Sequence, residues 1–227
     1  MNASTLIAAV MFDVDGVVVE SELLHLKTFN EILAPFEIQI TENEWKTKFL
    51  GAGSAVIMST IFDENGIAED PEPLIMQRRI RYRERVENGE LQSVSGFSSF
   101  YDTVREANIP IAFVSTGHPI SLNAALKSLG LLDKHLVIDA TQVIHVKPNP
   151  EPYLLGAKSL LVPPEQCLVF EDSPRGVSAA KSAQMTCVAL TTTNPAKDLT
   201  HADLIIPNFD GLTIQTLCEK LGKRLKG

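Results

Sequence analysis

The sequence predicts an α/β fold, a Rossmann-like parallel sheet core with an inserted all-α helical cap domain. Short, continuously apolar runs recur along the chain, as expected for strands buried on both faces of a parallel sheet. Stretches of helical length separate these runs, which is the alternation of βαβ units. One stretch of about 70 residues after the first run contains no such strand. This stretch predicts the inserted helical domain.

The apolar runs are the expected strands. The first covers residues 6–12 and ends at Asp13. The later runs cover residues 111–114, 136–138, 167–170, 186–190 and 204–206. Cys167 and Cys187 fall on two of these runs, and we interpret them as small buried hydrophobic residues.

Helices are expected between the strands. In the stretch 97–107, apolar side chains recur at spacings that place them on one helical face. These side chains are Phe97, Phe100, Tyr101, Val104 and Ala107. The other helical stretches lie near residues 119–129, 151–161, 174–183 and 211–222.

The stretch from residue 20 to residue 93 interrupts the alternation. Three helices are expected in it, near residues 23–33, 55–62 and 73–86. The predicted domains are a catalytic core of residues 1–19 and 94–227 and a helical cap of residues 20–93. Trp45 is expected in the core of this cap or on its surface.

A basic run lies on the third of these helices. Its members are Arg78, Arg79, Arg81, Arg83 and Arg85. Because these positions spread around a helix, a solvated cap helix is the simplest interpretation. Steering of an anionic substrate is the alternative.

The overall charge disfavours a nucleic-acid partner. Lys and Arg number 20 against 28 Asp and Glu, a formal net charge of −8, whereas nucleic-acid-binding proteins present clustered positive charge. No apolar run approaches the ~20 residues of a membrane span. The first run lacks the preceding positive charge of a signal peptide. Three scattered cysteines fit reduced thiols, so we expect a cytoplasmic protein without a membrane partner.

Polar residues gather where the predicted strands end. Ligands of open parallel sheets bind outside the carboxyl ends of the strands, so these side chains are expected to meet at one edge. Together with a lysine from a loop, they are Asp13, Asp15, Ser115, Thr116, Lys147, Glu171 and Asp172.

The chemistry of this set favours phosphoryl transfer. Its carboxylates are hard oxygen ligands of the kind that Mg²⁺ prefers. Hydroxyl groups and backbone N–H groups bind phosphate oxygens, and Lys147 adds a positive charge. Asp13 and Asp15 lie two residues apart, so one carboxylate can attack phosphorus while the other acts as the general acid and base.

Four segments resemble the motifs of the haloacid dehalogenase-like hydrolase superfamily, in the family order. Residues 12–17 resemble the first motif, and residues 114–116, 147–148 and 170–173 are similar to the second, third and fourth. Residues 174–176 resemble the helix start of the β-phosphoglucomutase-like branch, and the helical stretch resembles the cap of that branch. The resemblance covers essentially the whole chain.

The resemblance implies a role for each matching residue. Asp13 matches the nucleophile and a metal ligand, and Asp15 matches the general acid/base, with its backbone carbonyl also binding Mg²⁺. Ser115, which fits the position better than Thr116, matches the phosphate-binding hydroxyl. Lys147 matches the lysine that holds the nucleophile and the phosphate. Asp172 matches a metal ligand, with Glu171 in the same acidic pair.

One departure from the family pattern is Val146, where family members often have glycine before the lysine. Dehalogenase members lack the second acid, so the presence of Asp15 favours phosphoryl transfer. The resemblance therefore implies a Mg²⁺-dependent phosphatase that hydrolyses a small phosphorylated metabolite through an aspartyl-phosphate.

Two other functions remain open. The first is a β-phosphoglucomutase-type sugar-phosphate mutase, whose cap loop carries a Lys-Gly pair and an arginine. The matching residues 49–54 contain neither Lys nor Arg, although Lys48 lies just upstream. The second is a non-catalytic binding or regulatory protein that retains the fold.

We expect a monomer because the cap already covers the site. His25 could contact substrate, and His118 is expected to be structural.

Overall fold

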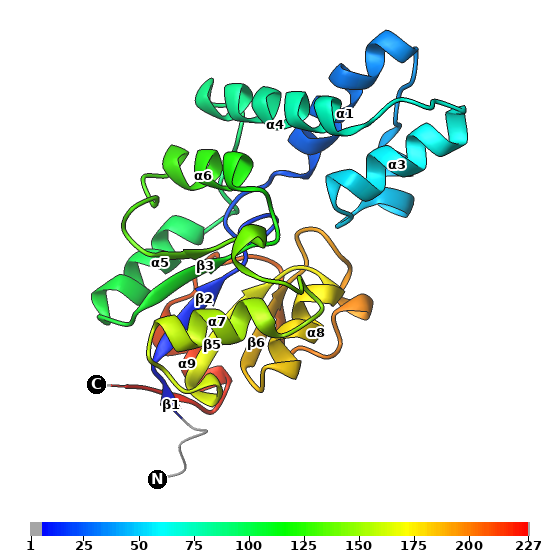
Figure 1. The fold of residues 1–227 in the computed structure, drawn as a ribbon. Coiled ribbons are helices and arrows are strands. Elements are labelled where there is room, and N and C mark those ends of the chain that lie inside the picture. The colour runs from blue at the N-terminus through cyan, green and yellow to red at the C-terminus, as the bar shows by residue number, and fades with distance from the viewer. Residues whose placement is uncertain (1–5, 227) are drawn as a thin grey trace.

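The computed structural model describes residues 6–226 of the chain. Within them, six strands form one parallel sheet in the order β4-β3-β2-β5-β6-β7 (Figure 1). The strands are β2 (Ala9–Phe12), β3 (Ile111–Val114), β4 (Leu136–Ile138), β5 (Cys167–Glu171), β6 (Thr186–Leu190) and β7 (Leu204–Ile206). All six coincide with predicted apolar runs, so the predicted α/β fold with a Rossmann-like parallel sheet is confirmed.

The strand order reverses at β2. From β2 the chain builds β3 and β4 on one side, and it later adds β5, β6 and β7 on the other. A reversal of this kind leaves a crevice at the carboxyl ends of the strands, where ligands of open α/β sheets bind. Asp13 follows β2 directly and therefore lies at the centre of that edge.

The strand formed by the first apolar run is shorter than the predicted strand of residues 6–12. Only residues 9–12 join the main sheet, whereas β1 (Leu6–Ile7) pairs with β8 (Arg224–Leu225) in a separate two-stranded sheet. Ala8 separates the two segments and donates its N–H to the Gln166 carbonyl. The short β8 has no apolar run, and its pairing was not predicted.

Helices cover both faces of the sheet. On one face lie α5 (Phe97–Glu106), α6 (Pro119–Ser128) and α9 (Ile214–Lys220), and on the other lie α7 (Glu151–Ser159) and α8 (Pro174–Ser182). The first face is rich in aromatic rings, with Phe12 stacked on Phe170 at 5.0 Å between ring centroids. Each helix lies within a predicted helical stretch. Cys167 and Cys187 are buried on strands, as expected.

Residues 22–87 contain helices and no strand among the described elements. They form α1 (Glu22–Leu33), α2 (Glu42–Glu44), a π-helical turn Trp45–Phe49, α3 (Ser54–Asn65) and α4 (Glu72–Glu87). These helices share a hydrophobic cluster that includes Phe29, Trp45 and Met58, which places Trp45 in the core of this layer. The helical layer lies beyond the carboxyl ends of the strands (Figure 1). The division at residues 20 and 93 stays a prediction.

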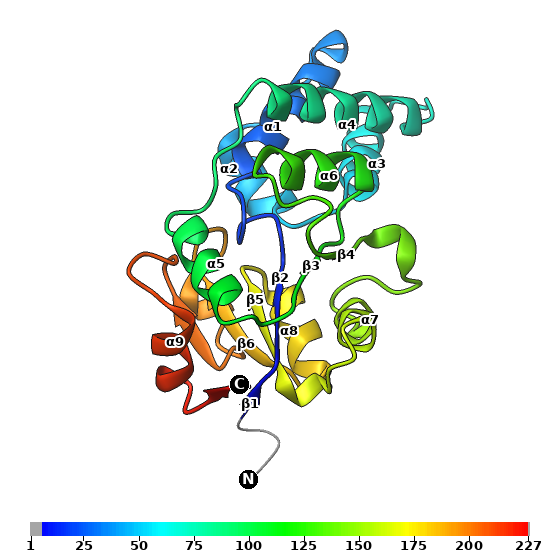
Figure 2. The ribbon, with the colours of Figure 1, turned by 90° about the vertical axis from the view of Figure 1, so that its left-hand side faces the viewer.

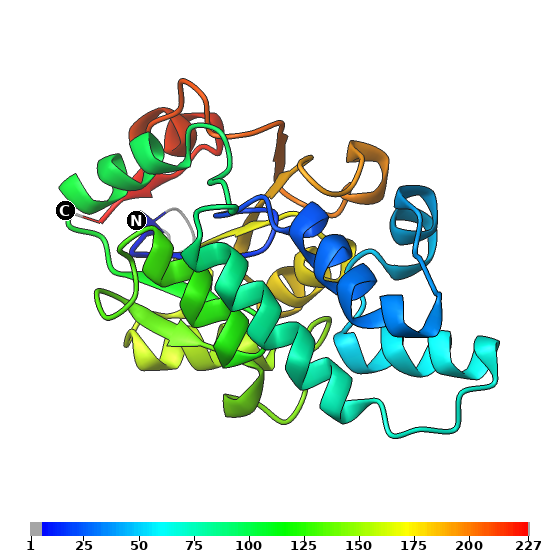
Figure 3. The same cartoon turned by 90° about the horizontal axis from the view of Figure 1, so that it is seen from above.

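The main helix-to-helix contact between the helical layer and the core is made by α4. Helix α4 packs against α6 (Figures 2 and 3). Leu24, Tyr82, Val86 and Ala124 form a small buried cluster at this contact. The two connections run side by side, because Val19 forms an antiparallel bridge with Ser93. No helix within residues 6–226 is long and apolar enough to span a bilayer.

The interpretation of the basic run as a solvated face is wrong for one residue. Arg78 is only 4% exposed, because its guanidinium lies 4.8 Å from the Phe29 ring centroid on α1 and 5.9 Å from that of Tyr82. The other four arginines pair with acidic residues. The pairs are Arg79–Glu72, Arg81–Glu84, Arg83–Glu87, Arg85–Glu31 and Arg85–Glu90.

Candidate active site

The functional residues come from the carboxyl ends of three adjacent strands. Asp13 follows β2, Ser115 follows β3, and Asp172 follows β5. Backbone hydrogen bonds continue past the strand ends, from the Asp13 N–H to the Phe170 carbonyl at 3.0 Å and from the Ser115 N–H to the Ile138 carbonyl at 2.9 Å. These bonds fix the three segments relative to one another, so the predicted residues converge at one edge.

Lys147 reaches this edge from the loop before α7. Its Nζ donates to Asp13 Oδ1 at 2.5 Å, to Glu171 Oε1 at 2.7 Å and to the Val114 carbonyl at 2.8 Å. The side chain is buried, and its Nζ lies 4.7 Å from the ring centroid of Tyr153. All three ammonium donors therefore have acceptors, and the lysine bridges Asp13 and Glu171.

Glu171 is held by donors on both of its carboxylate oxygens. Oε1 accepts from Lys147 and from the Tyr153 hydroxyl at 2.6 Å, and Oε2 accepts from the Asp172 N–H and from Ser173 Oγ, each at 3.2 Å. A Cβ on Gly176 would come within 1.9 Å of this carboxylate, so only glycine fits there. Sequence reasoning missed Tyr153, because a tyrosine on a helix face carries no signal of its long-range partner.

Three carboxylates gather with oxygens within 4.8 Å of one another: those of Asp13, Glu171 and Asp172. The pKa of Asp13 is raised to about 8, chiefly by burial and also by the charges of Glu171 and Asp15, although Lys147 lowers it. Burial and the charges of Asp13 and Glu171 raise the pKa of Asp172 well above its ordinary value. A buried set of oxygen donors with excess negative charge fits Mg²⁺.

Asp15 lies in a separate network that reaches into the helical layer. Its Oδ1 accepts from Ser21 Oγ at 2.5 Å and from His25 Nε2 at 3.2 Å. Arg78 Nη1 lies 3.0 Å from His25 Nδ1. Because a guanidinium only donates, Nδ1 must accept, and Nε2 then carries the proton that is donated to Asp15. The imidazole is thus fixed in one neutral tautomer.

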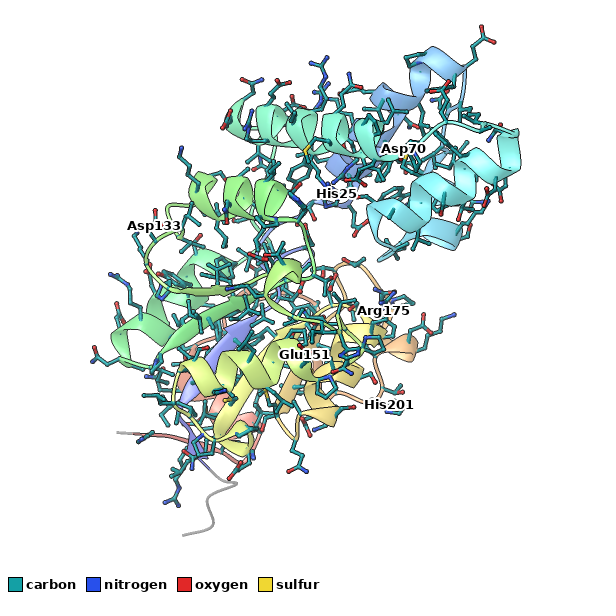
Figure 4. The ribbon with its side chains drawn as sticks, viewed as in Figure 1. His25, Asp70, Asp133, Glu151, Arg175 and His201 are labelled. Atoms are coloured by element: carbon teal, nitrogen blue, oxygen red, sulfur yellow. The ribbon has the colours of Figure 1, made fainter. Side chains whose placement is uncertain are left out.

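The network also sets the charge state of Asp15. Burial raises the pKa of this carboxyl, but the His25 and Ser21 hydrogen bonds and the Arg78 charge outweigh burial, so the pKa lies below its ordinary value. His25 extends from α1 toward the core (Figure 4). The structure places His25 in hydrogen-bond contact with Asp15, and the expectation that His25 could contact substrate stays a prediction.

Asp13 and Asp15 therefore have different surroundings, as two carboxylates with different tasks require.

A family model described as haloacid dehalogenase-like hydrolase matches residues 10–190, which include all four motif segments. The chain belongs to the haloacid dehalogenase-like hydrolases. The family resemblance and the prediction of an enzyme of this family are confirmed.

Individual haloacid dehalogenase-like proteins are similar over most of the chain. YhcW of Bacillus subtilis (strain 168) is 33% identical over 185 residues, which cover 81% of this chain and 83% of that protein. The fructose-1-phosphate phosphatase YqaB of Escherichia coli (strain K12) is 32% identical over 187 residues, covering 80% and 95%. The crystal structure of β-phosphoglucomutase from Clostridium difficile matches with a TM-score of 0.81 at 24% identity, covering 95% and 97%, which shows a shared fold.

The first haloacid dehalogenase-like motif turns sharply at Gly16. This residue has φ +73°, and a Cβ on it would lie 1.9 Å from Asp172 Oδ2 and 2.4 Å from Thr193 Oγ1. The Gly16 carbonyl accepts from Thr192 Oγ1 at 2.5 Å, and Asn194 Nδ2 donates to the Asp172 carbonyl at 2.9 Å. The segment after β6 therefore braces the first and fourth motifs, a contact that no sequence pattern indicated.

Ser115 and Thr116 differ in placement. Ser115 is buried and its Oγ accepts from the Gly117 N–H at 2.9 Å, whereas Thr116 is exposed. A Cβ on Gly117 would lie 3.1 Å from Ser115 Oγ and 3.8 Å from Asp15 Oδ2, so this segment lies beside both. His118 is the N-cap of α6 and accepts from the Ile120 N–H at 3.3 Å. This contact fits the structural role expected for His118.

The loop that matches the mutase cap loop carries no free cation among residues 48–54. Lys48 forms an ion pair with Glu64 on α3. Gly51 has φ +71°, and no atom lies within 4 Å of a Cβ built on Gly51 or Gly53. The loop is therefore open and uncharged, apart from the paired lysine at its start.

Proposed function

We propose that this protein is a Mg²⁺-dependent phosphatase that hydrolyses a small phosphomonoester, a sugar phosphate or similar metabolite, through an aspartyl-phosphate on Asp13. The observation that carries the proposal is the contrast between two carboxylates two residues apart. Asp13 lies 2.5 Å from the ammonium of Lys147, and Asp15 is held by neutral donors, Ser21 and His25. The phosphatase among the relatives supports a phosphoric monoester hydrolase.

The first half-reaction uses both acids. A carboxylate oxygen of Asp13 attacks phosphorus, and the bond between phosphorus and the leaving oxygen breaks. Asp15 acts here in its protonated form, which its lowered pKa makes the minor one, and gives that proton to the leaving oxygen, which departs as an alcohol. In the second half-reaction water attacks the same phosphorus, Asp15 takes the water proton, and Asp13 is released as a carboxylate together with inorganic phosphate.

Lys147 and Ser115 have supporting roles in this proposal. Lys147 favours the ionised form of Asp13 and offsets negative charge on the transferring group, and Ser115 donates a hydrogen bond from its hydroxyl to a phosphate oxygen. Asp13 and Asp172 would hold Mg²⁺, with Glu171 in the same group and the Asp15 carbonyl as a further ligand. The bound ion supplies Lewis-acid stabilisation of phosphoryl charge. Glu171 also holds Lys147, as its hydrogen bonds indicate.

The helical layer is proposed to act as a cap that excludes water from the first step and admits it for the second. His25 belongs to this cap, so the position of the cap affects the hydrogen bond between His25 and Asp15. The paired Lys48 and the open, uncharged loop after it favour hydrolysis over a mutase reaction, because they offer no cation for a second phosphate.

The test compares wild type with Asp13→Asn. We expect Mg²⁺-dependent hydrolysis of an aryl phosphate by wild type and loss of that activity in Asp13→Asn. Unchanged activity in the variant would contradict the mechanism, and no activity in wild type would favour the non-catalytic alternative. Incubation with a hexose 1-phosphate and a bisphosphate primer then separates the enzyme classes. Isomerised sugar phosphate without released phosphate would identify a mutase.

A further inference from the structure

The loop that carries Lys147 has an unusual attachment to the core. Residues 143–150, between a 3₁₀ turn and α7, have no helix or strand. Two of its apolar side chains point to solvent, with Ile144 86% exposed and Val146 40% exposed. Burial of these two side chains therefore contributes little to fixing the loop. The loop must nevertheless be fixed, because it positions the Lys147 ammonium against Asp13 and Glu171.

Arg175 holds the loop at the backbone of Lys147 itself. On α8, its Nη2 and Nε both donate to the Lys147 carbonyl oxygen, at 2.6 Å and 3.2 Å. Arg175 lies in the first turn of α8, directly after the segment that carries Glu171 and Asp172. It thereby ties the loop to the segment that supplies the acceptor for the Lys147 side chain.

Glu151 holds the same loop at a second place. On the first turn of α7, its Oε1 accepts from the Ile144 N–H at 2.8 Å, and its Oε2 accepts from the His145 N–H at 2.9 Å. His145 Nδ1 also lies 3.0 Å from Oε2. Figure 4 shows Glu151 and Arg175 on the neighbouring helices α7 and α8.

We propose that Arg175 and Glu151 are positioning residues for phosphoryl transfer. They place the Lys147 ammonium by fixing the loop backbone, Arg175 at the Lys147 carbonyl and Glu151 at the N–H groups of residues 144 and 145. The proposal rests on the function proposed above. Charged groups on backbone acceptors and donors form stronger hydrogen bonds than neutral partners do. A displacement of about 1 Å at a catalytic group can cost on the order of 10²-fold in rate. Neither side chain needs to touch the substrate for this effect.

An exposed arginine near a phosphate site could instead attract the anionic substrate. That role predicts a different kinetic signature. Loss of attraction raises KM and changes the salt dependence of kcat/KM, whereas loss of Lys147 placement lowers kcat at an unchanged KM. A purely structural role predicts a loss of activity that follows the loss of thermal stability.

The test measures kcat, KM and the thermal midpoint for Arg175→Met, Arg175→Lys and Glu151→Gln, with Arg105→Met on α5 as the matched control. We expect Arg175→Met to lower kcat about tenfold or more with KM changed less than about threefold, and Arg175→Lys to recover part of the loss because it restores one donor. Glu151→Gln should lower kcat less, since one acceptor oxygen remains.

A double-mutant cycle decides whether the effect passes through Lys147. In the Lys147→Met background, we expect Arg175→Met to change kcat by less than about twofold, because the ammonium it positions is gone. An equal fold-loss in both backgrounds, a loss confined to KM, or a loss that follows the thermal midpoint would each overturn the proposal. If Lys147→Met retains wild-type kcat, the proposed function fails in its assignment of Lys147, a result separate from the Arg175 cycle.

Discussion

Lys147 donates a hydrogen bond to Asp13 at 2.5 Å although 134 positions separate the two residues in the chain. The same ammonium contacts Glu171 at 2.7 Å, so one cation is shared by two buried carboxylates. This arrangement makes Lys147 important both for the reaction and for the folded state, and the two effects are separable by experiment.

Lys147→Met should lower kcat by about 10²–10³, the cost of removing one group that stabilises developing charge. In metal-free buffer the variant should also be less stable by about 3–5 kcal/mol, because two buried acids lose their partner. Steady-state kinetics and urea unfolding in EDTA measure the two effects. Lys127→Met, at an exposed position on α6, is the control and should change neither. Wild-type stability of Lys147→Met in EDTA would contradict the shared ion pair.

Asp172→Asn should make the metal-free protein more stable at neutral pH. The raised pKa of Asp172 means that the folded state binds a proton more tightly than the unfolded state, so ionisation disfavours folding. Its contribution to stability is therefore present below the unfolded pKa near 3.8 and is lost as pH rises toward the folded pKa. Asparagine does not ionise, so the variant does not lose stability as the pH rises to neutral.

The same variant should lose the stabilisation by Mg²⁺. Saturating wild type at 100 times the dissociation constant should add about 2.7 kcal/mol, and Asp172→Asn should gain much less. Thermal unfolding in EDTA and in a Mg²⁺ series measures both effects, with Asp198→Asn as the exposed control. Two results would contradict this prediction. One is that Asp172→Asn is less stable than wild type in EDTA, and the other is that Mg²⁺ stabilises the variant as much as it stabilises wild type.

The sequence was sufficient to predict the residues at strand ends. Asp13 and Asp172 follow apolar runs, and parallel strands bring their carboxyl ends to one edge, so their convergence follows from topology. The four motif segments then supplied Lys147, whose loop has no periodic signal of its own. These residues were predictable because topology or a motif carries the information.

Other parts of the site depend on contacts between elements that sequence patterns do not specify. Arg78 belongs to a run of arginines that looks solvated, and only the packing of α4 on α1 buries it beside His25. Tyr153 reaches Glu171 from α7, which packs against β2, β3, β4 and α8, and nothing in a helical periodicity identifies that partner. The short pair of β1 and β8 escaped prediction because β8 is two residues long.

Arg78→Met should impair general acid catalysis more than it impairs substrate binding. Without the Arg78 donor, His25 is free to change tautomer, and its Nε2 hydrogen bond to Asp15 is no longer enforced. We expect kcat to fall about tenfold for an alkyl phosphate, part of the 10²–10⁴-fold that a positioned acid contributes. The loss should be smaller for p-nitrophenyl phosphate, whose leaving group needs little protonation.

Arg81→Met is the matched control for that measurement, since Arg81 is exposed and pairs with Glu84 on the same helix. His25→Phe should reproduce the leaving-group dependence of Arg78→Met, because it removes the same donor from Asp15. Equal losses for both substrates would place Arg78 outside the proton-transfer step.

His118 should make stability depend on pH in mildly acidic solution. Burial, followed by the charge of Arg79, lowers the pKa of His118 in the folded protein, and the charges of Asp139 and Glu72 oppose this only in part. As pH falls from the unfolded value near 6.5 toward the folded pKa, the unfolded state takes up the proton first, so stability falls. Well above pH 6.5 the ring is neutral in both the folded and the unfolded state, so His118 no longer contributes to the pH dependence of stability.

Protonation of the ring also has a local cost. Nδ1 accepts from the Ile120 N–H at the start of α6, and a protonated Nδ1 can no longer accept. His118→Asn keeps an N-cap acceptor but does not titrate. The thermal midpoint of wild type should therefore fall more steeply between pH 7 and pH 5 than that of His118→Asn, while the two proteins stay close at pH 8. Parallel curves over this range would show that His118 titrates alike in the folded and unfolded states.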